Sequence, residues 1–123
     1  MILADTSVWV DHLRRTNSDF AQLLEEGEIL SHPFIVGELA LGYLDPRDLI
    51  LRNLRDLRRS VVASHDEVLN FINQERLFGL GIGYVDAHLL ASTRLTDGAV
   101  LWTRDVRLHR VAQRLKLTNR RPP

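Results

Sequence analysis

The chain has 123 residues, 45% of them hydrophobic, and its 16 basic and 16 acidic residues balance to zero net charge. This length allows one small domain with a hydrophobic core, so residues 1–123 are predicted to form a single domain. The lack of cysteine excludes disulfides and thiolate metal sites, and no apolar run approaches the roughly 20 residues that span a bilayer. No signal peptide is visible, because Asp5 interrupts the N-terminus, so we expect a cytoplasmic protein with no membrane partner.

Basic residues gather towards the end of the chain. From Arg104 onward there are seven basic residues and a single acid, Asp105, and Lys116 is the only lysine of the whole sequence. Arginine pairs with phosphate through two parallel hydrogen bonds and stacks on bases, so this bias is compatible with a nucleic-acid partner. A genome rich in arginine codons explains the bias equally well.

A short apolar run opens the chain and gives way at once to polar residues. Residues 1–4 are predicted to form a buried strand, because the run ends at Asp5, Thr6 and Ser7, which are typical of a turn. A helix is expected over residues 8–15, with Thr6 or Ser7 as its cap. Asp5 would therefore lie at the carboxyl end of the first strand.

The rest of the chain repeats this alternation of strand and helix. Further strands are predicted at residues 29–31, 61–63, 99–102 and 116–118. Further helices are predicted to follow the caps Asn17, Asp45 and Ser64, to open with Pro33, to span residues 85–95 and to fill the amphipathic segment after Asp105. This alternation is typical of a three-layer α/β/α fold with a parallel sheet and helices on both of its faces.

Four carboxylates occupy notable positions in these elements. Asp5 and Asp105 come directly after predicted strands, at the edge where open α/β sheets bind ligands. Glu38 and Asp86 share stripes with apolar residues of their helices, where a charge is costly unless it is paired or binds a cation. Each of the three aspartates could instead cap a helix, whereas Glu38 lies in the middle of one.

The four side chains would repel one another if the fold brought them together. A single pair at about 4 Å costs roughly 4 kcal/mol at an effective dielectric constant of 20. Such a cluster therefore needs protons or a cation. Because hard oxygen ligands select Mg²⁺ or Mn²⁺ over zinc, the pattern predicts a site for one of these ions.

Four motifs, in this order, resemble those of PIN-domain ribonucleases, and specifically VapC-type toxins of toxin–antitoxin pairs. They are Asp5-Thr6-Ser7-Val8-Trp9-Val10, Gly37-Glu38-Leu39-Ala40, Val85-Asp86-Ala87-His88-Leu89-Leu90-Ala91 and Leu101-Trp102-Thr103-Arg104-Asp105. The resemblance covers nearly the whole chain. It implies a PIN-like fold with a five-stranded parallel sheet, a homodimer, an RNA substrate and an antitoxin protein that blocks the cleft.

The resemblance also implies roles for individual residues. The acidic quartet of the family corresponds to Asp5, Glu38, Asp86 and Asp105, and its hydroxyl groups to Thr6 or Ser7 and to Thr103. The implied activity is that of a Mg²⁺- or Mn²⁺-dependent endoribonuclease, in which Asp5 and Asp86 ligate the metal and Glu38 positions the attacking water. Asp105 would hold a second ion or its waters, and Thr6 and Thr103 would orient carboxylates or contact phosphate.

Two other functions stay open. The chain could be a PIN nuclease that processes RNA outside a toxin pair, or a non-catalytic module that binds RNA or a partner. A phosphatase of the aspartyl-phosphate type also begins with a strand-end aspartate, but it needs a second aspartate where Ser7 stands.

Aromatic and basic side chains beside the expected site have two interpretations each. Trp9 and Trp102 either stack on bases or pack in the core, and core packing is the simpler role. The arginines of the last helix either contact phosphate or solvate that face. The histidines, His12, His32, His65, His88 and His109, are scattered along the chain and are expected to be structural or on the surface.

Overall fold

A short parallel sheet lies at the centre of the molecule, and the computed structural model describes all residues from 1 to 123. The strands are β1 (Ile2–Ala4), β2 (Ile29–Leu30) and β3 (Val100–Trp102), in the order β2-β1-β3. Leu3 of β1 pairs with Leu30 on one side and with Leu101 on the other, and all three are buried. Short apolar runs of this kind are typical of strands covered on both faces.

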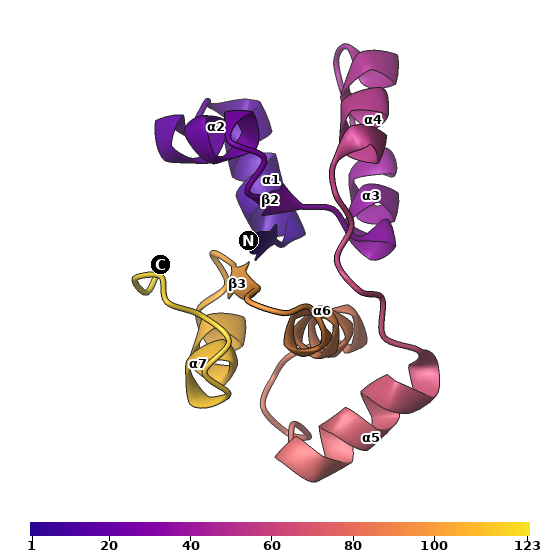
Figure 1. Cartoon of the computed structure of the whole chain (residues 1–123), viewed down its shortest axis with the longest axis vertical. Coiled ribbons are helices and arrows are strands. Elements are labelled where there is room, and N and C mark those ends of the chain that lie inside the picture. Colours follow the sequence, from indigo (N-terminus) through magenta and orange to yellow (C-terminus); the bar gives the residue numbers. More distant parts are fainter.

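Seven helices surround the sheet. They are α1 (Thr6–Arg14), α2 (Ser18–Glu25), α3 (Pro33–Ala40), α4 (Arg47–Asp56), α5 (His65–Glu75), α6 (Tyr84–Leu95) and α7 (Val106–Arg114). In Figure 1, α1 to α4 lie on one side of the strands and α5, α6 and α7 on the other. The predicted α/β architecture with a parallel sheet is confirmed. No helix has both the length and the apolar composition needed to cross a membrane.

One contiguous cluster of 25 buried apolar residues forms the core. Its central helix is α6, in which every residue from 87 to 93 is buried. Phe20 of α2 and Leu108 of α7 are fully buried and enter the cluster from opposite ends of the sequence. Burying a side chain of this size stabilises the fold by about 1.5–3 kcal/mol. Such buried side chains hold together strands and helices that are distant in the sequence, so their ends meet at one edge of the sheet.

Two predicted strands do not form as strands, so the count of five is not confirmed. At residues 61–63, Val61 and Val62 are exposed, and the backbone N–H groups of Val61 and Ala63 donate to the hydroxyls of Thr96 (2.9 Å) and Ser92 (3.2 Å) of the α6 region. These side chains take the donors that a ladder would use. Nearby, Arg59 forms only an isolated bridge to Ser31, the residue that follows β2.

The expected strand at residues 116–118 makes one ladder bond, from the Leu101 N–H to the Leu117 carbonyl at 2.7 Å. Lys116 has a φ of 59°, in the left-handed region, and this breaks the extended conformation before a second bond can form. The segment nevertheless stays on the sheet edge, because the Leu117 side chain is buried in the core.

Helix starts agree with the sequence in one case and differ in two. The capping box of α5 is confirmed, since Ser64 and Glu67 exchange backbone and side-chain hydrogen bonds of 2.9 and 3.1 Å. The α4 helix begins at Arg47, and the predicted cap by Asp45 does not form because that residue stands one position too far from the free N–H groups. The α1 helix begins at Thr6, and its cap is Asp5 rather than Thr6 or Ser7.

Candidate active site

Asp5 is the centre of the candidate site. It follows β1 directly, and its backbone N–H donates to the Trp102 carbonyl at 3.0 Å, which joins the ends of β1 and β3. Its side chain is only 6% exposed. The carboxylate accepts hydrogen bonds from the Ser7 hydroxyl (2.5 Å), the Val8 N–H (3.3 Å) and the Thr103 hydroxyl. A buried carboxylate with these partners is held in one orientation.

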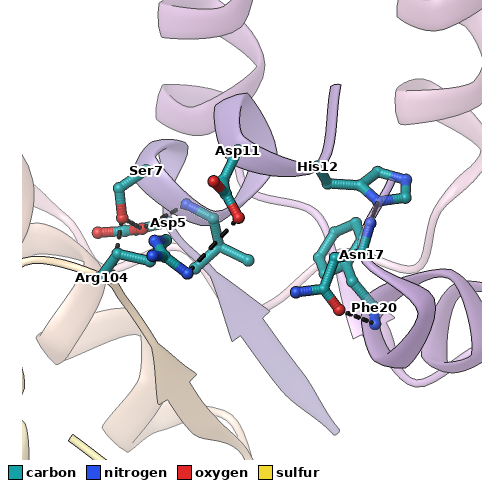
Figure 2. Close-up of polar contacts among 8 residues, drawn as sticks. Asp5, Ser7, Asp11, His12, Asn17, Phe20 and Arg104 are labelled. Atoms are coloured by element: carbon teal, nitrogen blue, oxygen red, sulfur yellow. Dashed lines mark hydrogen bonds and ion pairs between the residues drawn. The ribbon is translucent and has the colours of Figure 1, made fainter. Parts of the chain in front are cut away.

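The turn between β3 and α7 is tied to Asp5 through two hydroxyl groups. Ser7 accepts a hydrogen bond from the Arg104 N–H at 2.9 Å while it donates to Asp5 (Figure 2). Thr103 accepts from the Asp105 N–H at 3.0 Å while it donates to the other Asp5 oxygen. Of the two hydroxyl candidates after the first strand, Ser7 is therefore the one that contacts Asp5.

Thr6 connects the same region to α3. Its hydroxyl donates to the Glu38 carboxylate at 2.7 Å, so a helix-start residue of α1 orients a carboxylate 32 positions away. The expectation that Glu38 lies in a buried stripe is wrong, because its side chain is exposed. The buried residues of α3 are Ile35 and Leu39, which shifts the apolar face by one residue and leaves Glu38 at its border.

Asp86 lies in the first turn of α6 and is half-buried. Its carboxylate accepts a hydrogen bond from the Gly83 N–H at 3.1 Å, which caps the helix. Burial raises the pKa of Asp86 above its ordinary value, and the charges of Asp105 and Glu38 raise it further, against the opposing Gly83 hydrogen bond. Burial likewise raises the pKa of Asp5, and the charge of Asp86 adds to this effect. Asp86 is thus within electrostatic range of the other three carboxylates.

An aspartate of the site can cap a helix and still belong to the group of four carboxylates. Asp105 caps α7 by accepting from the Leu108 N–H at 2.9 Å, as Asp5 and Asp86 cap their own helices. No three aspartate, glutamate or histidine side chains lie close enough together to form a ready metal-binding group. The assignment of a metal site to the quartet therefore stays a prediction.

An ion pair that sequence reasoning missed borders the site. The Arg104 guanidinium lies 3.5 Å from the Asp11 carboxylate of α1, and both side chains are about half exposed (Figure 2). Asp11 is four residues after Ser7, so the two share one face of α1. The four-residue spacing of Ser7 and Asp11 is the sequence signal that could have predicted this contact. The ion pair places the positive charge of Arg104 beside Asp5 and Ser7.

The two tryptophans are not free to stack on bases. Trp9 is buried and packs edge-to-face against Phe20, with 4.8 Å between ring centroids. Trp102 has the Arg120 guanidinium 3.6 Å from its ring centroid and Phe20 at 5.7 Å. Both rings therefore serve packing.

Comparison with known proteins agrees with this geometry. The PIN domain family matches residues 2–114, so the chain belongs to the PIN-domain family. Two proteins named Ribonuclease VapC32, from two strains of Mycobacterium tuberculosis, are each 49% identical to it over 108 residues, which cover 88% of this chain and 87% of each relative. Within the family the chain is thus a VapC-type member, and the resemblance seen in the four motifs is confirmed.

Proposed function

We propose that this protein is a Mg²⁺- or Mn²⁺-dependent endoribonuclease that acts as the toxin of a toxin–antitoxin pair. The observation that carries the proposal is the buried Asp5 carboxylate at the carboxyl end of β1, with the charge of Asp86 beside it. The similarity to ribonucleases named VapC32 supports RNA as the substrate and an antitoxin as the partner.

The chemistry of the donors fits a hard divalent cation. All groups in the site are carboxylate or hydroxyl oxygens, and the chain has no cysteine. Asp5 and Asp86 would hold the ion, with Glu38 and Asp105 as further ligands or partners of its waters. When bound, the ion lowers the pKa of a coordinated water and neutralises negative charge on the phosphate. Its charge would also relieve the repulsion that raises the pKa of Asp86.

The hydroxyl groups prepare the carboxylates for this role. Thr103 and Ser7 each donate to a different oxygen of Asp5, which leaves its remaining lone pairs pointing in fixed directions. Thr6 fixes one oxygen of Glu38 and leaves the other free to orient a water molecule. Because these contacts exist in the protein alone, ordering them costs nothing when RNA arrives.

A cleavage assay tests the proposal. The purified protein is incubated with total RNA in Mg²⁺ or Mn²⁺, with EDTA as the control, and the new 5′ ends are sequenced. We expect cleavage that needs the metal and leaves 5′-phosphate and 3′-hydroxyl ends. Metal-independent cleavage, or 2′,3′-cyclic ends, would contradict the mechanism. No cleavage at all would indicate a non-catalytic module that binds RNA or a partner.

A surface groove supports a protein partner that reaches the site. The groove has a volume of about 600 Å³ between α1, α3 and the loop after α3, and its lining includes Val10, Tyr43 and Glu38. Tyr43, which lines the groove, is 92% exposed, and Leu41, two residues before it in the chain, is 90% exposed. Exposed apolar patches mark interaction sites. A segment that fills the groove would touch Glu38, so we propose that the antitoxin binds here and blocks the site.

The partner proposal has its own test. The cognate antitoxin should abolish cleavage by the parent protein and should inhibit the Tyr43→Asp variant much less. Equal inhibition of both proteins would place the antitoxin elsewhere. A homodimer is proposed as well, and light scattering of the purified protein should give twice the 14.1 kDa of one chain.

A further inference from the structure

A second, basic pocket lies next to the acidic site. It has a volume of about 480 Å³ and is formed by the end of β3 and residues 119–123. Its lining includes three arginines, Arg104, Arg120 and Arg121, and no acidic side chain. Thr103 belongs both to this pocket and to the hydrogen-bond network of Asp5, so the two sites share a wall.

Arg120 fixes the terminal segment that builds the pocket. Its guanidinium lies over the Trp102 ring at 3.6 Å and pairs with the Asp19 carboxylate of α2 at 2.6 Å. A cation in this position is attracted by the negative face of the aromatic ring. These contacts tie the terminal segment to the end of β3 and to α2.

The two other arginines are available to an anion. Arg121 is exposed and makes no ion pair or side-chain hydrogen bond. Arg104 has only its 3.5 Å contact with Asp11, between side chains that are 54% and 45% exposed. An exposed pair of this kind is weak, so Arg104 can exchange Asp11 for a phosphate at little cost.

We propose that this pocket is a phosphate subsite, in which Arg104 and Arg121 bind the RNA backbone next to the scissile bond. RNA as the ligand rests on the proposed function. Arginine binds phosphate through two parallel hydrogen bonds, which suits a wall held rigid by the Arg120 stack. Because the Arg120 guanidinium already lies over the Trp102 ring, the pocket recognises the backbone rather than a base stacked on that face.

An RNA strand explains the position of the pocket better than an acidic protein segment does. Its phosphates are evenly spaced and can occupy the acidic edge, with its cation, and the arginine pocket at the same time. Thr103 lines the pocket and also contacts Asp5, so one RNA strand can pass from one site to the other.

The test is a binding titration of the full chain in the Asp5→Asn background. A labelled single-stranded RNA is titrated in Mg²⁺ buffer at several salt concentrations, and gels verify that it stays intact. Arg121→Ala should weaken binding roughly five- to tenfold at low salt and lower the salt slope by about 0.7, the value for one phosphate of a single strand. Arg104→Ala should act similarly, and two unrelated RNA sequences should lose the same factor.

Arg52→Ala is the matched control, because Arg52 is exposed on α4, a helix that lies away from the C-terminus in Figure 1. It should change neither affinity nor slope. Unchanged binding in both Arg121→Ala and Arg104→Ala would overturn the proposal. It would also be wrong if Arg121→Ala weakened the binding of polyglutamate and left RNA binding intact. Because this background measures binding alone, a parent protein that fails to cleave RNA would refute the proposed function separately.

Discussion

Two polar clusters include residues of α6, and they differ in how their buried polar groups are stabilised. The histidine cluster consists of His32, His88 and Ser92; the acidic cluster consists of Asp5, Glu38, Asp86 and Asp105. In the histidine cluster the His32 ring accepts from the Phe34 N–H at 3.0 Å and donates to Ser92 at 3.1 Å. Ser92 lies a further 3.4 Å from the His88 ring. None of these three side chains has a buried polar atom without a partner.

The protonation of the two clusters follows from these surroundings. Burial, with the neighbouring charges of His88 and Arg59, lowers the pKa of His32 to about 4, and burial also lowers the pKa of His88. Both rings are therefore neutral at pH 7. In the acidic cluster, burial and like charges raise the pKa of Asp5 and Asp86 instead. The first cluster stabilises the fold, while the second retains repulsion that a cation can relieve.

Removing a charge from the centre of the acidic cluster should have the largest effect. In Asp5→Asn, the helix cap can persist, but the proposed metal ligand is lost. We expect RNA cleavage to fall by about a thousandfold or more, because metal stabilisation supplies several kcal/mol. Thermal unfolding should occur at the same or a higher temperature, since a carboxylate with a raised folded-state pKa opposes folding when ionised.

Asp97→Asn provides a surface control for this comparison, because Asp97 is exposed in a turn. It should cleave RNA at the parent rate. Parent-like cleavage by Asp5→Asn would remove Asp5 from its assigned role.

The histidine cluster should respond to pH instead. Because the folded-state pKa of His32 is about 4 and its unfolded value is near 6.5, the unfolded chain binds more protons between these values. Its contribution to stability is present above pH 6.5 and falls by about 3 kcal/mol as the pH drops to 4. The raised pKa values of Asp5 and Asp86 act in the opposite direction, so the comparison must be made against a variant.

His32→Asn keeps an acceptor for the Phe34 N–H and removes the titrating ring. Urea unfolding from pH 7 to pH 4 should show that this variant loses less stability than the parent. Identical slopes in the two proteins would mean that His32 does not titrate in this range.

The hydroxyl of Thr103 should have an intermediate effect on the acidic cluster. Thr103→Val removes the donor to Asp5 and leaves the Asp105 N–H without its acceptor, at a cost of about 1–3 kcal/mol in stability. Losing that donor raises the pKa of Asp5 further, so the acidic limb of the rate profile should move to higher pH. Thr103→Ser keeps the hydroxyl and should restore the parent pH–rate profile. If the profile does not move in Thr103→Val, the hydrogen bond from Thr103 to Asp5 has no role in cleavage.

The smallest effect is expected where the site reaches the surface. Thr6→Val breaks the hydrogen bond to the exposed Glu38, and a net contribution of about 0.5–1.5 kcal/mol corresponds to a loss of cleavage of roughly three- to tenfold. The free energy of unfolding should stay nearly constant, because both groups are accessible to water. A loss as large as that of Asp5→Asn would mean that Thr6 does more than orient Glu38.

The sequence predicted those features of the fold that depend on local signals. The strand before Asp5, the capping box at Ser64 and the first-turn position of Asp86 each follow from a few neighbouring residues. The expectation that Asp5 and Asp105 come to one sheet edge also needed only the alternation of strands and helices.

Other features depend on contacts between distant segments. Val61 and Val62 have strand propensity, but hydroxyls of Thr96 and Ser92 capture the backbone donors nearby. The helical spacing of the sequence predicts an apolar stripe that includes Phe34, Glu38 and Leu41. In the structure Ile35 is buried instead, and Glu38 is exposed. Only tertiary packing decides which of these alternatives is buried.

The contact between Asp5 and Thr103 spans 98 positions of the chain. During synthesis on the ribosome, the central strand β1 emerges early, but its partner strand β3 and the Thr103 hydroxyl follow only in the last fifth of the sequence. A nascent chain therefore cannot assemble the carboxylate in its final setting until translation of the domain is almost complete. The proposed nuclease would therefore stay inactive for most of its synthesis.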